Sequence, residues 1–372
     1  LIEGFTVTNG GNANGDSDEA AGGINVWGGS PRLESLIISD NRREKWSGGG
    51  IHVTSSGNPL IENCTIKDNW AQYDGGGIDI WKASAEIRNC VISNNSSLNN
   101  PAFQIKNPDF STNPTSVIMD NVEVMNHSCT DCSNTIDIWK TTATLNNVRL
   151  HNNEAGTALS VDDATLEMNN SMFHNNSVTY GSIYVKLSAN AIISNSIINN
   201  NNASGDGGGL RIDSNGSATL QNVTISNNTA SDNGGGISIY QGSLVASNLV
   251  LSNNVSDIGE LALDSTSVVT FINSTIIGNK ARNEYHQGIF VNTGTVRTMN
   301  SIVRDNSFNL ADSGSLTITH SNVEGGWDGE GNIDAAPHFI DAANGNYHIG
   351  DYSPGIGAGV YSAQFDDTWY YA

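Results

Sequence analysis

The chain has 372 residues, a formal net charge of −22 at pH 7, and only 15% charged residues. Such an acidic surface repels nucleic acid and anionic membranes, which argues against DNA or RNA as a partner. No run of roughly eighteen apolar residues occurs, so this segment contains no membrane span. The 40 glycines and 7 prolines, without a long 3.6-residue periodicity, favour short strands and tight turns.

The chain starts at Leu1, without a charged and apolar leader. We therefore expect the natural protein to be longer, with any export signal removed or lying upstream and with further domains as partners of this region.

A pair of asparagines separated by five residues recurs along the chain with a period of mostly about 23 to 28 residues. The first member of the pair is Asn63, Asn89, Asn121, Asn147, Asn170, Asn195, Asn222, Asn248, Asn273 and Asn300. The second member is Asn41, Asn69, Asn95, Asn153, Asn176, Asn201, Asn228, Asn254, Asn279 and Asn306, and His127 replaces one asparagine. Asparagine tolerates the left-handed backbone of a sharp corner, and its amide can both donate and accept. We expect both columns to form corner ladders.

Three short strands accompany each repeat. One lies between the two asparagines, as in residues 64–66, and a second precedes the first asparagine, as in residues 60–62. The third follows glycines, as in residues 48–51, 75–78, 207–210 and 234–237. Three strands and three corners per period predict an all-β parallel solenoid of about 13 rungs. We assign residues 1–326 to this solenoid and residues 327–372 to a closing segment packed on the last rungs.

The Gly-Gly-Gly-Ile strands and the Asn-x5-Asn corners resemble the right-handed parallel β-helix repeats of the pectate-lyase-like superfamily. They are most similar to repeats of bacterial secreted and surface proteins related to polymorphic outer-membrane proteins, and residues 331–359 resemble the closing segment of such proteins. The resemblance implies a secreted or cell-surface location and a structural or adhesive role. It does not imply one activity, because the superfold includes lyases, hydrolases, epimerases and adhesins.

The outer face of the glycine-led strand carries two rows of side chains with functional chemistry. The first row is predicted to be Asn25, His52, Asp79, Gln104, Asp137, Ser160, Tyr184, Arg211 and Ser238. The second row is predicted to include Trp27, Trp81, Lys106, Trp139, Asp162, Lys186, Asp213 and Tyr240. The three tryptophans recur every second rung, a spacing of about two sugar rings at roughly 4.8 Å per rung.

Two interpretations of this face remain open. In the first, Trp27, Trp81 and Trp139 stack on a polysaccharide or cell-surface glycan, the lysines bind its acidic groups, and Asp79, Asp137 and His52 bind its hydroxyls. The residues of that site, besides the tryptophans, are Lys82, Lys106, Lys140, Lys186, Tyr184 and Arg211. In the second, the tryptophans cover neighbouring turns, and the charged residues only solvate an exposed sheet.

Catalysis is a further alternative, in the form of a polysaccharide lyase or related carbohydrate-active enzyme acting on an acidic glycan. The candidate catalytic residues are His52, Asp79, Lys82, Asp137 and Lys140. No cofactor is required by these residues, but calcium is a candidate because carboxylates precede several of the glycines. Its candidate ligands are Asp74, Asp206 and Asp232.

The four cysteines form two groups. Cys64 and Cys90 occupy the same position in consecutive rungs, where they form either a stacked disulfide or two packed thiols. Cys129 and Cys132 form a C-x-x-C in an enlarged corner, and in an exported protein this spacing favours a local disulfide.

Overall fold

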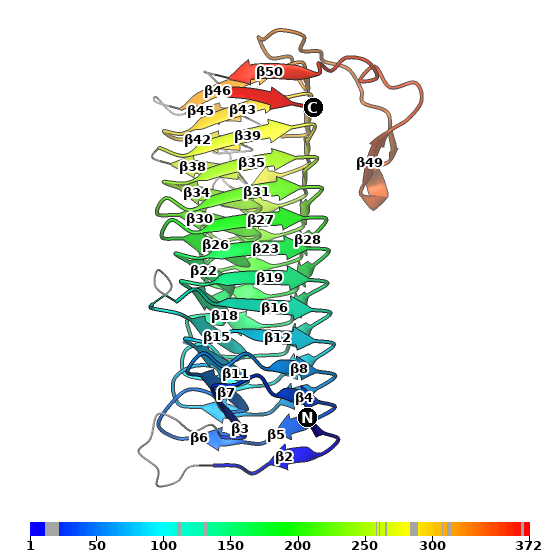
Figure 1. Ribbon diagram of the computed structural model, residues 1–372. Helices are drawn as coiled ribbons and strands as arrows, with labels where there is room; N and C mark the ends of the chain where they lie inside the picture. Colours follow the sequence, from blue (N-terminus) through cyan, green and yellow to red (C-terminus); the bar gives the residue numbers. More distant parts are fainter. Residues whose placement is uncertain are drawn as a thin grey trace.

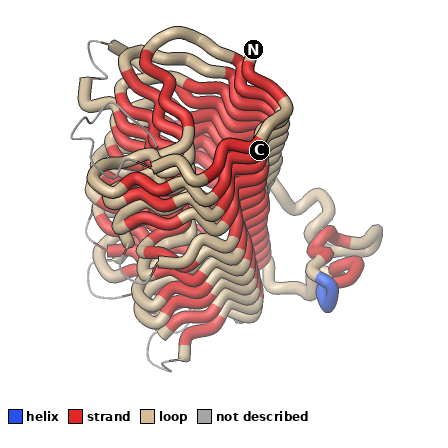
Figure 2. The backbone as a smooth tube through the Cα atoms, turned by 90° about the horizontal axis from the view of Figure 1, so that it is seen from below, coloured by secondary structure: helices blue, strands red, loops and turns tan. Residues whose placement is uncertain are grey.

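A computed structural model describes residues 1–11, 22–109, 113–129, 132–257, 259, 261–264, 266–282, 289–306, 308–310, 314–365 and 368–372. Over these residues the chain is an elongated stack of parallel strands with three long sheets along its length (Figure 1). The predicted parallel β-helix with three strands per rung is therefore confirmed. Viewed along the rod, corresponding strands of successive rungs lie over one another (Figure 2).

The front sheet is made of the strands that precede the first asparagine column. Its thirteen described strands are β1 (Ile2–Glu3), β4 (Arg32–Glu34), β8 (Leu60–Glu62), β12 (Ala85–Arg88), β16 (Ser116–Asp120), β19 (Thr142–Asn146), β23 (Thr165–Asn169), β27 (Asn190–Ser194), β31 (Ser217–Gln221), β35 (Ser243–Ser247), β39 (Val268–Ile272), β43 (Thr295–Met299) and β46 (Ser315–Thr319).

The asparagine sheet lies between the two asparagine columns. Its thirteen described strands are β2 (Thr6–Thr8), β5 (Ile37–Ser39), β9 (Thr65–Lys67), β13 (Val91–Ser93), β17 (Glu123–Met125), β20 (Arg149–His151), β24 (Met172–His174), β28 (Ile197–Asn199), β32 (Thr224–Ser226), β36 (Val250–Ser252), β40 (Thr275–Ile277), β44 (Ile302–Arg304) and β47 (Asn322–Val323).

The glycine sheet follows the glycines of each repeat. Its twelve described strands are β3 (Ile24–Trp27), β7 (Ile51–Thr54), β11 (Ile78–Trp81), β15 (Phe103–Lys106), β18 (Asn134–Trp139), β22 (Thr157–Asp162), β26 (Ile183–Lys186), β30 (Leu210–Asp213), β34 (Ile237–Tyr240), β38 (Leu261–Asp264), β42 (Ile289–Val291) and β45 (Phe308–Leu310).

Two narrow sheets line the corner after the second asparagine. One contains β6 (Arg42–Arg43), β10 (Trp70–Ala71) and β14 (Ser96–Ser97). The other contains β21 (Glu154–Ala155), β25 (Ser177–Val178), β29 (Asn202–Ala203), β33 (Thr229–Ala230), β37 (Val255–Ser256) and β41 (Lys280–Ala281).

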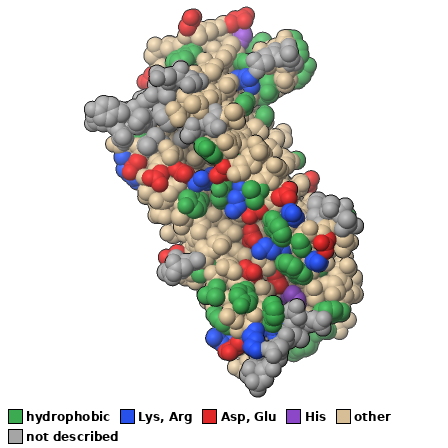
Figure 3. All heavy atoms as spheres, turned by 90° about the vertical axis from the view of Figure 1, so that its left-hand side faces the viewer, with side chains coloured by type: hydrophobic (Ala, Val, Ile, Leu, Met, Phe, Trp, Pro, Cys, Tyr) green, Lys and Arg blue, Asp and Glu red, His purple; other side chains and the backbone are tan. Residues whose placement is uncertain are grey.

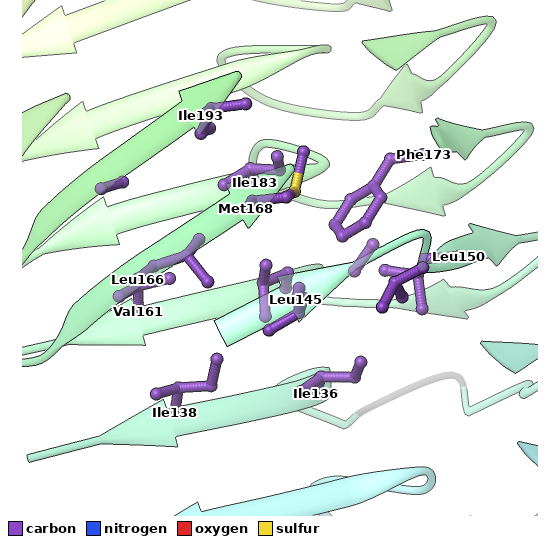
Figure 4. Packing of buried hydrophobic residues seen from close by; sticks show 14 of the residues in the cluster. Ile136, Ile138, Leu145, Leu150, Val161, Leu166, Met168, Phe173, Ile183 and Ile193 are labelled. Atoms are coloured by element: carbon purple, nitrogen blue, oxygen red, sulfur yellow. The ribbon is translucent and has the colours of Figure 1, made fainter. Parts of the chain in front are cut away.

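The core consists of the inward side chains of the three long sheets, each stacked on its equivalent one rung away. In the asparagine sheet, Leu150 pairs with Phe173 and Phe173 with Ile198, and all three are fully buried. Figure 4 shows Phe173 beside Met168 of the front sheet, with aliphatic side chains from all three sheets around them. Burial of these columns supplies the main stabilisation of the rod.

The two asparagine columns have different structures. First-column residues such as Asn195 (φ 49°) and Asn222 (φ 55°) take the left-handed conformation and are exposed, with their amides hydrogen-bonded at 3.1 Å. In the second column, Asn201 is buried, and its Nδ2 donates to Asn228 Oδ1 at 3.0 Å. The left-handed residue of that corner is the preceding one, Asn200 (φ 55°). The expectation that both columns hold the corner conformation is therefore wrong for the second column.

Asn201 illustrates the hydrogen bonds that a second-column residue donates. The backbone N–H of Asn201 and its Nδ2 both donate to Asn228 Oδ1 at 3.0 Å, and Nδ2 also donates to the carbonyl oxygen of Phe173 at 3.1 Å. The glycine-led strand packs closely against these amides, since a Cβ at Gly77 would lie 3.0 Å from Asn95 Nδ2. At Gly77 a side chain would therefore crowd the ladder.

His127 continues the ladder in place of an asparagine. Its Nδ1 lies 3.0 Å from Asn153 Oδ1, and its Nε2 lies 3.3 Å from Asn95 Nδ2. Because an amide oxygen only accepts and an amide nitrogen only donates, the imidazole is neutral with its proton on Nδ1. Complete burial lowers the pKa of His127 to about 4, since charge is disfavoured away from water.

We expect Asn228→Ala to lower the free energy of unfolding by about 1 to 3 kcal/mol, because its neighbours would keep buried polar groups without partners. Asn222→Ala should lower it less, because the amides that lose a partner are exposed to water. Asn222→Gly should lower it least, because glycine takes the left-handed conformation of residue 222 without strain. Denaturant unfolding of the three variants checks the order. Equal losses for Asn228→Ala and Asn222→Gly would contradict a structural role confined to the second column.

The C-terminal residues form two hairpins. The first comprises β48 (Phe339–Asp341), η1 (Ala342–Asn344) and β49 (Asn346–Ile349) and projects from the rod in Figure 1, with Tyr347 OH accepting from Asn253 at 3.2 Å. The second comprises β50 (Ser362–Phe365) and β51 (Thr368–Tyr371) and packs Phe365 against Ile272 and Met299. No helix within the described residues is long and apolar enough to span a membrane.

All four cysteines are free thiols in the structure. Cys64 and Cys90 are buried in adjacent rungs, and the backbone N–H of Cys64 lies 3.4 Å from Cys90 Sγ. The structure differs from the disulfide predicted for Cys129 and Cys132, since both are free and Cys132 Sγ donates to the carbonyl oxygen of Cys129 at 3.4 Å.

Candidate functional site

The outer face of the glycine sheet has the two rows that the sequence predicts. In the first row His52 pairs with Asp79, Asp79 with Gln104, and Gln104 with Asp137. In the second row Trp81 pairs with Lys106, and Lys106 with Trp139. Trp27 lies two rungs before Trp81, which confirms the two-rung spacing of the three tryptophans.

The first row is far more buried than an outward row on an exposed sheet. His52, Asp79, Gln104 and Asp137 have exposed fractions of 6%, 2%, 2% and 5%. His52 Nδ1 and Asp79 Oδ2 are 2.7 Å apart, which makes a buried pair at the floor of the face. Burial raises the pKa of Asp79, while the hydrogen bond to His52 partly opposes that shift.

Two polar atoms of the floor have no hydrogen-bond partner among the described residues. They are Asp79 Oδ1, an acceptor, and Gln104 Nε2, a donor, on adjacent rungs of the same row. Buried polar atoms of native proteins nearly always have partners, so such atoms in a cavity wall mark a place where a ligand can supply them.

Asp137 and Asp162 form an acidic centre two rungs further along. Burial, together with the charge of Asp162, raises the pKa of Asp137 to about 7 against the opposing charges of Lys106 and Lys186. Burial also raises the pKa of Asp162, which accepts a hydrogen bond from Ser160 Oγ at 2.8 Å. A carboxyl group that titrates near neutrality can transfer a proton.

The tryptophan side chains differ in accessibility. Trp27 is 53% exposed and Trp81 36% exposed, so neither is buried beneath a neighbouring turn. Trp139 is less open, because Lys106 Nζ and Lys140 Nζ lie 5.8 Å and 5.0 Å from its ring centre. Trp27 and Trp81 are therefore the stronger stacking surfaces.

Three adjoining cavities of about 610, 540 and 660 Å³ cover this face. The first and second share Asp74, Trp81 and Lys106, while the second and third share Asn134 and Lys186. We call this continuous depression the groove. It runs along the rod axis from Trp27 to Tyr184, on the left of Figure 1. Figure 3 shows that face, where basic, acidic and hydrophobic side chains are mixed.

The basic residues predicted to hold a glycan all contact carboxylates. The lysine ion pairs are Lys82–Asp109 at 2.7 Å, Lys106–Asp137 at 3.6 Å, Lys140–Asp163 at 3.9 Å and Lys186–Asp162 at 3.4 Å. Arg211 pairs with Asp206 at 3.0 Å and lies over the rings of Tyr180 and Tyr184. Tyr184 OH donates to Asp213 at 2.9 Å. The groove is thus lined by ion pairs rather than by a basic patch.

The sequence matches the family described as right handed beta helix region over residues 17–196, 78–256 and 179–329. The chain belongs to the right-handed β-helix family. Among solved structures, pectate lyase Pel9A is similar, with 13% identity, 83% of this chain and 84% of that chain covered, and a TM-score of 0.48. The A-module of Azotobacter vinelandii mannuronan C-5 epimerase AlgE6 is also similar, with 13% identity, 83% and 91% covered, and a TM-score of 0.41. No curated protein matches the sequence.

The β-helix does not bring the candidate calcium ligands together. Asp74 accepts from Asn100 at 2.8 Å, and Asp206 accepts from Asn233 and Arg211, so both carboxylates serve corner hydrogen bonds. Asp232 lies in the rung after Asp206. No cluster of three or more acidic, histidine or cysteine side chains suited to a metal occurs in the described part of the β-helix.

The two rows predicted from the sequence do not include the aromatic residues that form the walls of the groove. Trp46 and Tyr73 line the first cavity, and Tyr180 lines the third, with exposed fractions of 38%, 43% and 44%. Each precedes the glycine that begins a third strand by one or two residues, at Gly48, Gly75 or Gly181. An aromatic residue just before that glycine is the signal that identifies them.

Proposed function

We propose that this β-helix is the glycan-binding region of a larger secreted or cell-surface protein, and that a polysaccharide chain lies along the rod axis in the groove. The observation that carries the proposal is the alignment of exposed Trp27 and Trp81, two rungs apart, beside a buried polar floor. Aromatic rings supply stacking surfaces for sugar rings, and the floor supplies hydrogen-bonding groups for their hydroxyls.

An elongated groove suits a polymer better than a small molecule. Its three cavities share lining residues, so one chain can contact several rungs at once. Each rung adds about 4.8 Å to the contact length. Adhesion to a glycan-coated surface follows naturally from such repeated contacts, because several weak subsites on one chain raise the overall affinity.

The proposal predicts that Trp81→Ala weakens binding of a soluble polysaccharide by about 1 to 3 kcal/mol, a magnitude taken from stacking of nucleic-acid bases on aromatic rings. Trp139→Ala should have a smaller effect, because lysines already contact that ring. Isothermal titration calorimetry with polymers identified on a glycan array measures both changes.

Trp369→Ala is the matched control, since Trp369 is 55% exposed on the C-terminal hairpin, away from the groove. Its affinity should equal that of the unchanged protein. If Trp81→Ala instead lowers the melting temperature and leaves glycan affinity intact, the tryptophan is a structural cover and the proposal fails.

A second candidate function is acid–base catalysis on the bound glycan, as in a lyase or hydrolase. It is favoured by the buried His52–Asp79 pair together with Asp137, whose pKa of about 7 suits proton transfer at neutral pH. Incubation with polysaccharides, followed by assays for unsaturated products in the ultraviolet and for new reducing ends, distinguishes catalysis from binding alone. Glycan binding without either product would exclude this candidate for the polymer tested.

A further inference from the structure

The charges that line the groove do not suit an anionic ligand. Its lysines are Lys82, Lys106 and Lys186, and each already has an aspartate partner. Its carboxylates outnumber them, being Asp74, Asp79, Asp137, Glu154 and Asp162. A uronate placed here would lie close to these carboxylates. Among the described lining residues, no lysine without an acidic partner would be there to bind it. Once these carboxyl groups are ionised, their Coulomb interaction with a uronate is unfavourable overall.

The floor of the first cavity instead has groups that match a hydroxyl. Asp79 Oδ1 can accept a hydrogen bond and Gln104 Nε2 can donate one, and neither has a partner among the described residues. Both side chains are 98% buried, line the same cavity and lie on paired positions of adjacent strands. A sugar hydroxyl is both donor and acceptor, so one hydroxyl can satisfy the two atoms together.

The neighbouring residues place a stacking surface beside this subsite. Trp81 lies two residues after Asp79 in the same strand and lines the same cavity, so a sugar stacked on its indole lies close to the Asp79 carboxyl group. His52 Nδ1 lies 2.7 Å from the other oxygen of Asp79, which leaves Oδ1 as the carboxyl oxygen without a partner among the described residues. Stacking and hydroxyl recognition therefore act on one sugar unit.

We propose that the groove selects an uncharged polysaccharide, with one sugar stacked on Trp81 while its hydroxyl donates to Asp79 Oδ1 and accepts from Gln104 Nε2. This inference rests on the proposed glycan-binding function and specifies its ligand class. Selectivity against uronates comes from the excess of carboxylates, and recognition of the sugar comes from the Asp79–Gln104 subsite.

The test compares affinities of the intact protein for uncharged polymers (galactomannan, xyloglucan and mixed-linkage glucan) and for polygalacturonate and alginate of similar length. At low salt and pH 8, above the pKa of Asp137, we expect at least one uncharged polymer to bind about tenfold more tightly than either polyuronate. We also expect its affinity to change little as salt is raised, because no net charge pairs form.

The variant Gln104→Met keeps the side-chain size but removes the donor, so it should weaken binding of the uncharged polymer about tenfold. Gln221→Met makes the same change on the exposed front sheet and should leave affinity unchanged. Thermal unfolding of both variants confirms that the fold persists, and the polymer comparison itself needs no variant.

The outcomes separate the two proposals. Tighter, salt-sensitive binding of a polyuronate would overturn the inference while leaving glycan binding in place. Binding of an uncharged polymer that Gln104→Met does not weaken would overturn the assigned subsite. Failure of every polymer to bind would overturn the proposed function together with the inference.

Discussion

Replacing Asp137 with asparagine should raise the free energy of unfolding at pH 8 by about 3 to 4 kcal/mol and change it little at pH 4. Burial and the nearby Asp162 raise the pKa of the folded-state carboxyl to about 7, whereas an unfolded aspartate titrates near 3.9. Between these values the folded protein retains a proton that the unfolded chain has released. Stability therefore falls as the pH rises through this window, by about 1.4 kcal/mol per unit of pKa difference.

Asparagine preserves the shape of Asp137 and its hydrogen bond from Asn134, but it carries no charge at any pH. Denaturant unfolding across the pH range measures the effect. Asp163→Asn is the control, because Asp163 is exposed one rung away and should contribute no comparable pH dependence. A loss of stability on Asp137→Asn that is the same at all pH values would show that the carboxylate is needed for structure.

Replacing His127 with asparagine should raise the free energy of unfolding by about 3 kcal/mol at pH 4 and leave it nearly unchanged at pH 8. Burial lowers the pKa of the folded-state imidazole to about 4, while an unfolded histidine titrates near 6.5. Below pH 6.5 the imidazole is protonated in the unfolded chain but stays neutral in the folded protein. Stability present above pH 6.5 is therefore lost as the pH falls toward 4.

Asparagine at this position restores the residue found in the other rungs and supplies the same donor and acceptor to Asn153 and Asn95. His338→Asn is the control, since His338 is exposed in the C-terminal segment. If the acid sensitivity of unfolding is the same with and without His127, protonation of this ring does not limit stability at low pH.

These two groups act in opposite directions. Asp137 lowers the free energy of unfolding as the pH rises, and His127 lowers it as the pH falls. The groove and the ladder thus carry separate pH dependences, which the two single variants and the double variant can resolve.

The strand order and the register of the groove face could be predicted from the sequence. Alternating apolar residues, the glycine before each third strand and the asparagine period place His52, Asp79 and Gln104 in one row, and the structure pairs them in that order. A repeat fixes register because a slip by one residue would expose a whole column of core side chains.

The depth of the groove could not be predicted in the same way. His52 and Asp79 are buried because loop residues such as Trp46 and Tyr73 form walls beside them. The ion pair of Lys82 with Asp109 likewise joins the end of β11 to the loop after β15, one rung away. Such contacts depend on irregular segments, for which a repeat pattern contains no information.

The backbone conformation of the asparagine corners could not be predicted from the sequence either. The sequence identifies both asparagine columns, but it does not show which residue of a corner has positive φ. At the second corner that residue is Asn200 or its equivalents, and the ladder asparagine beside it faces the core. Only the stacked backbone distinguishes these neighbouring roles.

The buried ladder also gives the rod a direction. In the steps from Asn41 to Asn69 and from Asn254 to Asn279, the amide nitrogen donates to the amide oxygen of the following rung, and a backbone N–H donates to that same oxygen. The amide dipoles therefore add rather than cancel, as peptide dipoles do in a helix. A rung that is shifted, or that lacks an amide-like group, interrupts this alignment on both sides.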